Sequence, residues 1–270
     1  MNRVRPPAVA GQFYPANPVI LAEAIQSYLD AVPVPDISAD GRPPKALIVP
    51  HAGYIYSGPI AAHAYEHLRP FAHRVRRVVV LGPAHRVYFE GIAAPTVSGF
   101  ETPLGIVPVD QEAIQPLIAL HQVLSADAPH REEHSLEVQL PFLQSVLTDF
   151  KVVPLVVGDV SPFEVSKVIE RLWGGEETVF VISSDLSHYH PYREAKQLDG
   201  RTCEAIRQLQ PDAISDDMAC GRTPLKALLQ VAERHALRPD LLDYRNSGDT
   251  AGSRDRVVGY SAFIFEEQTH

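Results

Sequence analysis

The sequence predicts an α/β fold, a single domain in which a largely parallel central sheet is flanked by helices. Short apolar runs rich in β-branched residues alternate with amphipathic stretches of helical periodicity along the chain. Three of the apolar runs end directly in histidine or aspartate, as expected at the carboxyl edge of a parallel sheet, where ligands bind. No composition break or repeat divides the chain, so we expect one domain over residues 1–270.

The first half of the chain begins with an amphipathic stretch whose apolar residues recur near helical spacing, followed by a loop rich in Pro, Asp and Gly. A later stretch with many Gly and Pro residues is typical of short strands and a turn. The elements expected here are, in order, a helix at residues 18–32, a surface loop at 33–44, a strand at 45–50, a helix at about 59–68, a strand at 77–82, and short strands within 91–110.

The second half continues the alternation of helical periodicity with apolar β-branched runs. Helices are expected at residues 111–119, 135–147, 162–173, 191–209 and 224–235. Strands are expected at residues 152–157, 178–183, 241–247 and 256–265.

Composition limits the classes of function. The formal net charge is −9 and no block of basic residues stands out, which argues against nucleic acid as a partner. No apolar run approaches the ~20 residues needed to cross a bilayer, and the N-terminal residues lack the apolar core of a signal peptide, so we expect a cytoplasmic protein with no membrane contact. The two cysteines, Cys203 and Cys220, make no disulfide framework.

The three strand ends carry the strongest candidates for metal ligands. LIVPHAGYIYSG places His51 after one strand, VVVLGPAH places His85 after another, and VFVISSDLSHYH places Asp185 and His188 after a third. A metal ion needs donors that converge from different segments. His51 and His85 are therefore the best candidate pair, although each histidine taken alone is more often a hydrogen-bonded structural residue.

A second dense group of polar residues is HREEHSLEVQLPFL, at residues 130–143. Glu132 and Glu137 are explained by a helix start, where acidic side chains suit the helix dipole. His134 precedes the expected cap at Ser135, a position that favours a neutral imidazole able to act as a base. We therefore include His134 among the candidate site residues.

Two further candidates depend on local structure. Asp185 and His188 are three residues apart, so a helical turn would place them on one face, where the aspartate could orient the imidazole; a capped helix start is the alternative. Cys220 lies close to a helix expected to begin near Pro224. Its thiol is either buried and inert or has a pKa lowered by the helix N-terminus.

Other common catalytic motifs are absent. The sequence contains neither GxGxxG nor GxxxxGK[ST], and no GxSxG elbow. This leaves a metal site, or no catalysis.

The order of motifs resembles one known family along nearly the whole chain. RPPAVAGQFYP, PHAGYIYSG, LGPAH, TPLG, EEHSLEVQLPFL, SSDLSHYH, CGRTP and NSGDTAGSRDRVVGYSAF together are similar to the Memo family. Its prokaryotic members are known as protein B of the AmmeMemoRadiSam system, and the family resembles the class III extradiol ring-cleavage dioxygenases, which use non-haem Fe(II). The resemblance implies a dioxygenase-like α/β fold.

The resemblance also implies a metal site formed by His51, His85 and Cys220, with His134, Asp185 and His188 lining the pocket. The dioxygenases use two histidines and a carboxylate, whereas here the third donor would be a thiolate. Softer ligation admits copper or zinc as well as iron(II), and it places ring cleavage in doubt. We expect metal-centred redox chemistry in which His134 and His188 move protons and Asp185 orients a histidine.

Two alternatives remain open at this stage. The first is a non-catalytic binding or scaffold protein that uses the same crevice for an anionic or phosphopeptide ligand, and the second is a structural zinc site. The family also implies a radical-SAM protein of the same system as a partner. We expect the ligand to be a small molecule or a peptide.

Overall fold

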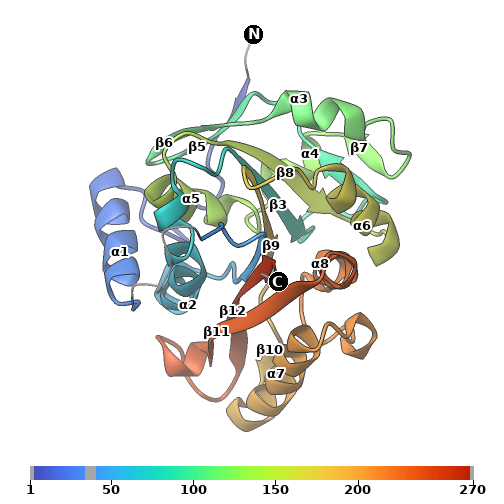
Figure 1. The fold of residues 1–270 in the computed structure, drawn as a ribbon. Helices are drawn as coiled ribbons and strands as arrows, with labels where there is room; N and C mark the ends of the chain where they lie inside the picture. Colours follow the sequence, from blue (N-terminus) through green and yellow to red (C-terminus); the bar gives the residue numbers. More distant parts are fainter. Residues whose placement is uncertain (1–2, 34–40, 268–270) are drawn as a thin grey trace.

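A computed structural model of the protein describes residues 3–33 and 41–267 (Figure 1). Most of the loop predicted at 33–44 lies outside these residues. Helices cover both faces of a central sheet, which confirms the predicted α/β fold. Within the described ranges, the longest helix has 16 residues and none combines the length and apolar character that a bilayer crossing requires.

The central sheet contains nine strands among the described residues, in the order β10-β12-β2-β9-β3-β8-β4-β7, with β11 paired to β12. The strands are β2 (Ala46–Val49), β3 (Arg77–Pro83), β4 (Ile92–Ala94), β7 (Val123–Ser125), β8 (Lys151–Val157), β9 (Thr178–Ser183), β10 (His188–His190), β11 (Leu237–Asn246) and β12 (Val257–Glu267). The four strands at the centre, β2, β9, β3 and β8, are all parallel to their neighbours. Antiparallel pairs occur only toward the two edges, at β12 and β4.

The parallel centre explains the apolar, β-branched character of its strands. Every residue of β2 and β9 is buried, and so is nearly all of β3 and β8, because helices cover both faces. Parallel register also brings the carboxyl ends of β2, β9 and β3 to one edge of the sheet, with Val49 opposite Ser183 and Leu81 opposite Ile182. This edge positions the candidate site.

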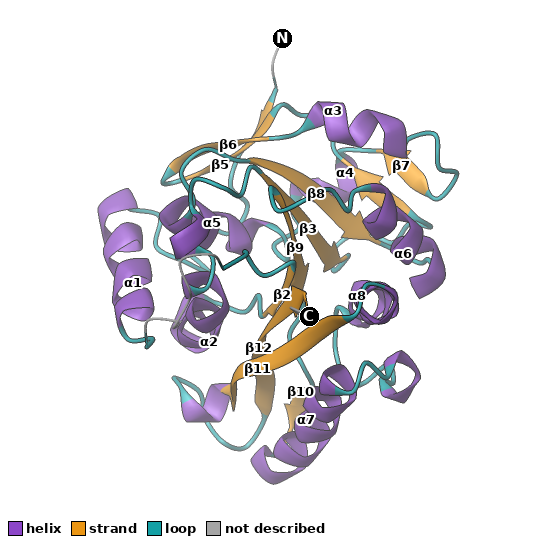
Figure 2. Cartoon of the chain, viewed as in Figure 1, coloured by secondary structure: helices purple, strands orange, loops and turns teal. Residues whose placement is uncertain are grey.

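The helices form two layers around the sheet (Figure 2). On one side lie α1, α2 and α5, and on the other lie α6, α7 and α8. The helices are α1 (Pro18–Asp30), α2 (Tyr54–Glu66), α3 (Gln111–Ile114), α4 (Ala128–Arg131), α5 (Leu140–Val146), α6 (Pro162–Arg171), α7 (Tyr192–Arg207) and α8 (Arg222–Arg234).

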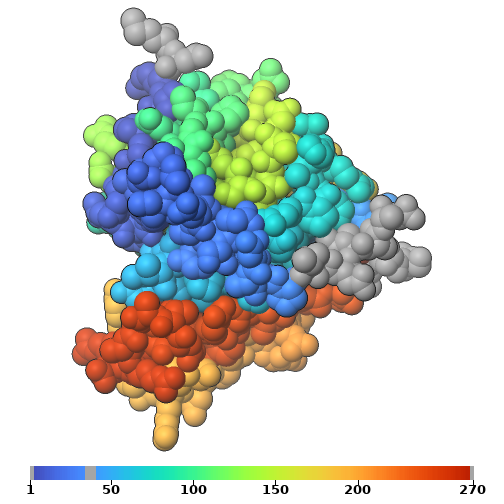
Figure 3. Space-filling model, turned by 90° about the vertical axis from the view of Figure 1, so that its left-hand side faces the viewer, coloured from blue at the N-terminus to red at the C-terminus, as the bar shows by residue number. Residues whose placement is uncertain are grey.

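A small second sheet ties the N-terminal segment to the middle of the chain. It contains β1 (Val4–Arg5), β5 (Gly99–Thr102) and β6 (Gly105–Pro108), with β1 parallel to β5. In the view from the side of α1, blue N-terminal residues lie on the visible face beside green and cyan residues from the middle of the chain, and red C-terminal residues lie below them (Figure 3).

Several predicted helix positions differ from the structure. The helix predicted at 111–119 is α-helical only to Ile114 and continues as a 3₁₀ turn over residues 115–117. Helix α2 begins at Tyr54, five residues before the predicted start, with Pro59 inside it. Residues 137–139 form a 3₁₀ turn before α5, so the helix expected from 135 begins late. The helical turn predicted to carry Asp185 and His188 is wrong, because His188 pairs with Val258 as the first residue of strand β10.

Candidate metal centre

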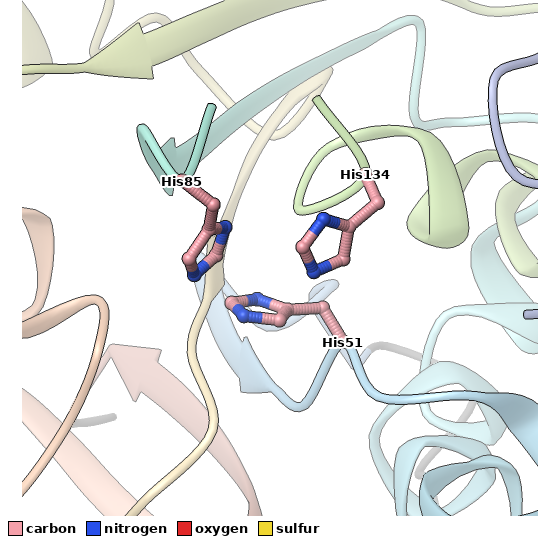
Figure 4. Close-up of side chains that lie close together, drawn as sticks. All are labelled: His51, His85 and His134. Carbon is pink, nitrogen blue, oxygen red and sulfur yellow. The ribbon is translucent and has the colours of Figure 1, made fainter. Parts of the chain in front are cut away.

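Three imidazoles meet at the carboxyl edge of the sheet (Figure 4). His51 follows β2, His85 follows β3, and His134 lies in the loop after α4. One ring nitrogen from each lies within 4.8 Å of the other two. The ring centroids of His51 and His85 are 5.1 Å apart, and those of His85 and His134 are 4.6 Å apart. Sequence reasoning grouped His51 with His85, and the structure adds His134 to them.

Ser183, the last residue of β9, fixes the proton position on His51. Its hydroxyl donates to the carbonyl of Ser135 at 2.5 Å and accepts the Gln139 amide at 2.7 Å. The remaining partner of this oxygen is Nδ1 of His51, at 2.9 Å. A hydroxyl has one proton, already used, so His51 Nδ1 must carry the hydrogen and Nε2 the lone pair. The free Nε2 is the form that binds a metal ion.

Glu133 fixes the proton position on His85. Oε1 accepts Nδ1–H of His85 at 2.9 Å, and Oε2 accepts its backbone N–H at 2.6 Å. The Glu133 carboxylate also accepts the backbone N–H groups of His134 and Ser135. Burial alone would raise the pKa of Glu133, but these bonds hold the pKa at about 2, so the group is ionised. Glu133 is not among the residues predicted from the sequence, where its place beside His134 is the one signal for it.

Cys220 lies beside His51. Its Sγ is 3.2 Å from Nε2 of His51 and accepts the backbone N–H of Asp185 at 3.3 Å. Burial raises the pKa of the Cys220 thiol to about 12, so the lowered pKa considered from the sequence is wrong. Helix α8 begins two residues after Cys220, at Arg222, but burial of the thiol has the larger effect on its pKa. The thiol is therefore protonated at pH 7 and can donate its hydrogen to Nε2 of His51.

Asp185 contacts His51 through the backbone. Oδ1 of Asp185 accepts the N–H of His51 at 2.7 Å, and Oδ2 is 4.0 Å from Nε2 of His51. Burial raises the pKa of Asp185 to about 7. His188 is half-buried on β10 and does not belong to the group of three imidazoles. The interaction of Asp185 with a histidine thus involves His51 and not His188.

The donor set suits a divalent transition metal. Burial lowers the pKa of His51 well below its usual value and that of His134 to about 4, so both rings are neutral at pH 7, as metal ligands must be. Among residues 3–33 and 41–267, the buried Nδ1 of His134 has no hydrogen-bond partner, although Glu133 Oε1 lies 3.4 Å away. Imidazole and thiol donors favour zinc, copper or iron over magnesium or calcium.

The loop that carries Glu133 and His134 is held by the N-terminal segment. Arg5 donates to the backbone carbonyls of His130 at 2.6 Å and Glu133 at 2.7 Å, and it forms an ion pair with Glu137. The Arg5 side chain is 5% exposed and the Glu137 side chain is fully buried. Glu137 begins the 3₁₀ turn before α5, as the sequence suggested, and it is in addition the partner of a buried arginine.

His130, in the same loop, predicts a pH dependence of stability. Its Nε2 lies 3.0 Å from the carbonyl of Ala93, and its buried Nδ1 has no partner. Burial lowers the pKa of His130 from 6.5 to about 4. Between pH 6.5 and pH 4 the unfolded chain binds more protons at this residue than the folded protein does. The free energy of unfolding therefore falls as the pH falls from 6.5, and the loss reaches about 3 kcal/mol at pH 4.

We expect His130→Asn to flatten the dependence of the urea midpoint on pH between 6.5 and 4, because the amide can bond to Ala93 without titrating. His121→Asn is the control, since His121 is 84% exposed and should leave the slope unchanged. Equal slopes for His130→Asn and the unmodified protein would contradict this assignment.

Comparison with known proteins agrees with the motifs. The family description "Memo-like protein" matches residues 5–264. MEMO1 family proteins from Sulfolobus acidocaldarius and Methanosarcina barkeri are each 36% identical over 97% of this chain, covering 99% and 100% of their own lengths. A MEMO1 family protein from Ignicoccus hospitalis is 38% identical over 97% of this chain and 98% of its own.

A solved structure supports the fold alone. The uncharacterized protein JW3007 from Escherichia coli K12 superimposes with a TM-score of 0.51 at 15% identity, covering 80% of this chain and 98% of its own. The match of the family to nearly the whole chain and the three relatives above 30% identity lead to one conclusion. The chain belongs to the Memo family.

Proposed function

We propose that this protein binds iron(II) or copper, with zinc as a further option, through His51, His85 and Cys220, and uses the metal for redox chemistry on a small molecule. The observation that carries the proposal is the state of the two imidazoles. Ser183 and Glu133 occupy Nδ1 of His51 and His85, which leaves each Nε2 free. Cys220 Sγ lies 3.2 Å from Nε2 of His51, so a cation bound to both would displace the thiol proton.

The bound metal would supply redox chemistry and Lewis acidity. His134 is neutral at pH 7, because burial lowers its pKa to about 4, so its imidazole has a nitrogen lone pair that could accept a proton during the reaction. Asp185 Oδ1 accepts the backbone N–H of His51 at 2.7 Å, which supports a positioning role. We propose His134 and His188 as proton carriers and Asp185 as the residue that positions His51.

Metal retention tests the ligand set. Protein purified without oxygen and loaded with Fe(II), Cu(I) or Zn(II) in separate samples should retain about one ion after desalting, measured by mass spectrometry. His51→Ala, His85→Ala and Cys220→Ala should each retain far less, whereas His121→Ala, an exposed histidine, should match the unmodified protein. Full retention in Cys220→Ala and loss in His134→Ala would instead identify three imidazoles as the ligands.

Proton release separates these two ligand sets independently. At pH 8 the Cys220 thiol is protonated, because its pKa is about 12, while His51 and His134 are neutral. Zinc binding through the thiolate should therefore release about one proton, which calorimetry in two buffers of different ionisation enthalpy measures. Binding through three imidazoles should release none. We expect one proton for the unmodified protein and none for Cys220→Ala.

The alternative is a non-catalytic protein that uses the same crevice for an anionic or phosphopeptide ligand. It predicts no stoichiometric metal after loading. A structural zinc would instead predict that chelation lowers the melting temperature and leaves any oxidase activity unchanged. A cytoplasmic location and a radical-SAM partner are further proposals that rest on composition and on the family; co-purification from cell extract tests the second.

A further inference from the structure

A cavity of about 420 Å³ opens beside the candidate metal centre. Its lining includes His85 and Cys220, two of the proposed ligands, and extends along residues 83–89, 157–160 and 222–224. This volume is within the range of small-molecule sites in proteins, about 300–1,000 Å³. A molecule of the size of one substituted aromatic ring can therefore reach the metal centre from this side.

Two arginines line the cavity. Arg86 directly follows His85, and Arg222 follows Cys220 by two residues, so each guanidinium belongs to the segment of a proposed metal ligand. Arg86 is exposed, and no acidic side chain lies within 4.0 Å of its guanidinium among residues 3–33 and 41–267. Arg86 is therefore available for a ligand in the cavity.

Arg222 is available as well. Its Nε lies 2.7 Å from Asp216, whose side chain is 86% exposed. An ion pair with so exposed a carboxylate contributes little stability, so a ligand can take its place. Of the charged side chains that line the cavity, Asp159 is the acidic one, and it already accepts the hydroxyl of Tyr88 at 3.0 Å.

The charge of the lining contrasts with that of the whole chain. Two arginines and one aspartate leave the cavity with a net charge of +1, whereas the chain carries −9. A concave site with a net positive charge on an acidic protein favours anionic over cationic organic ligands. Planar guanidinium groups also match the oxygens of carboxylates and phosphates in geometry.

We infer that the substrate is a small molecule with an anionic group, a carboxylate or a phosphate, which Arg86 and Arg222 bind while its uncharged end faces His85 and Cys220. The orientation of the substrate, with its uncharged end toward His85 and Cys220, rests on the proposed metal site. The preference for an anion does not depend on that proposal. Arg86 and Arg222 are thus residues that determine substrate class.

Three matched probes test the anion preference. Benzoate, benzamide and phenyl phosphate share one ring and differ in charge, and their binding is followed by ligand-observed NMR on zinc-loaded and on metal-free protein. We expect benzoate or phenyl phosphate to bind at least about tenfold more tightly than benzamide, as for a charge-assisted pair. The preference should weaken at high salt. Whichever of benzoate and phenyl phosphate binds more tightly shows whether the substrate carries a carboxylate or a phosphate.

The variants assign the preference to the two arginines. Arg86→Gln and Arg222→Gln should each reduce it, and the double variant should bind benzoate and benzamide equally. Arg207→Gln, an exposed arginine at the end of α7, is the control and should behave as the unmodified protein. Equal binding of the three probes to the unmodified protein, or a preference that survives the double variant, would overturn the inference.

Failure of the metal proposal gives a different result. In one outcome the unmodified protein retains no metal but still prefers benzoate, and the double variant loses this preference. That outcome refutes the metal site and supports the anion site. If zinc binds with equal affinity to the unmodified protein and the double variant but no anion preference exists, the anion site alone is refuted. Zinc affinity of the double variant also reports whether its fold is intact.

Discussion

Glu137→Gln is expected to lower the free energy of unfolding by about 3–5 kcal/mol, the cost of leaving one member of a buried ion pair without its partner. The Glu137 carboxylate accepts hydrogen bonds from Arg5, from the backbone N–H groups of Ala8 and Val9, and from the hydroxyl of Tyr14. Glutamine keeps the shape but replaces one acceptor oxygen by an N–H₂ donor that faces other donors. Urea unfolding followed by circular dichroism measures the change.

Glu132→Gln provides a matched control five residues away. Glu132 is exposed, and its substitution should change stability by less than about 0.5 kcal/mol. The double variant Arg5→Met with Glu137→Gln should be less destabilised than the sum of its single variants, because it removes the unpaired charge. Additive losses would show that Arg5 and Glu137 act independently.

Glu133→Gln is expected to reduce zinc affinity by about 10–100-fold, the usual effect of removing a carboxylate that orients a metal-binding histidine. The Glu133 carboxylate accepts four hydrogen bonds, and the glutamine amide, with one acceptor oxygen, cannot accept all of them. The donors are His85 Nδ1–H and the backbone N–H groups of His85, His134 and Ser135. His85 would lose its fixed ring orientation. Competition with a chromophoric chelator measures the affinity.

The pH dependence of the same variant gives a second readout. The pKa of Glu133, held at about 2, lies below its ordinary value of 4.5, so its ionised form contributes stability above pH 4.5 that is lost as pH falls toward 2. Glu133→Gln should remove that part of the acid unfolding curve, and Glu132→Gln should keep it. Unchanged zinc affinity with a normal melting curve would show that Glu133 does not position His85.

The predicted fold agrees with the structure where periodicity is strong. The buried runs of β2, β3, β8 and β9 are short, apolar and β-branched, and each was predicted within one or two residues. The start of α2 was predicted too late, because Gly58 and Pro59 are residues typical of a turn. A Cβ on Gly58 would lie 2.7 Å from the ring of Tyr28, so this glycine is needed for helix packing and not for a turn.

The site was predictable in part for the same reason. Histidines that end two parallel strands must lie at one sheet edge, and this brought His51 and His85 together. Glu133 could not be identified, because its role depends on how a loop 48 residues beyond His85 folds back. The sequence left two states of Cys220 open, a buried inert thiol or one with a lowered pKa, because sequence position reveals a nearby helix start but not the extent of desolvation; burial in fact raises the pKa.

The attachment of Arg5 has a consequence for the integrity of the centre. Arg5 is 125 residues from His130 along the chain, yet its guanidinium secures the segment that supplies His134 and Glu133. An exopeptidase that trims the first five residues would touch none of the candidate ligands. It would nevertheless release that segment, and the trimmed protein would bind metal poorly while most of its central sheet stayed folded.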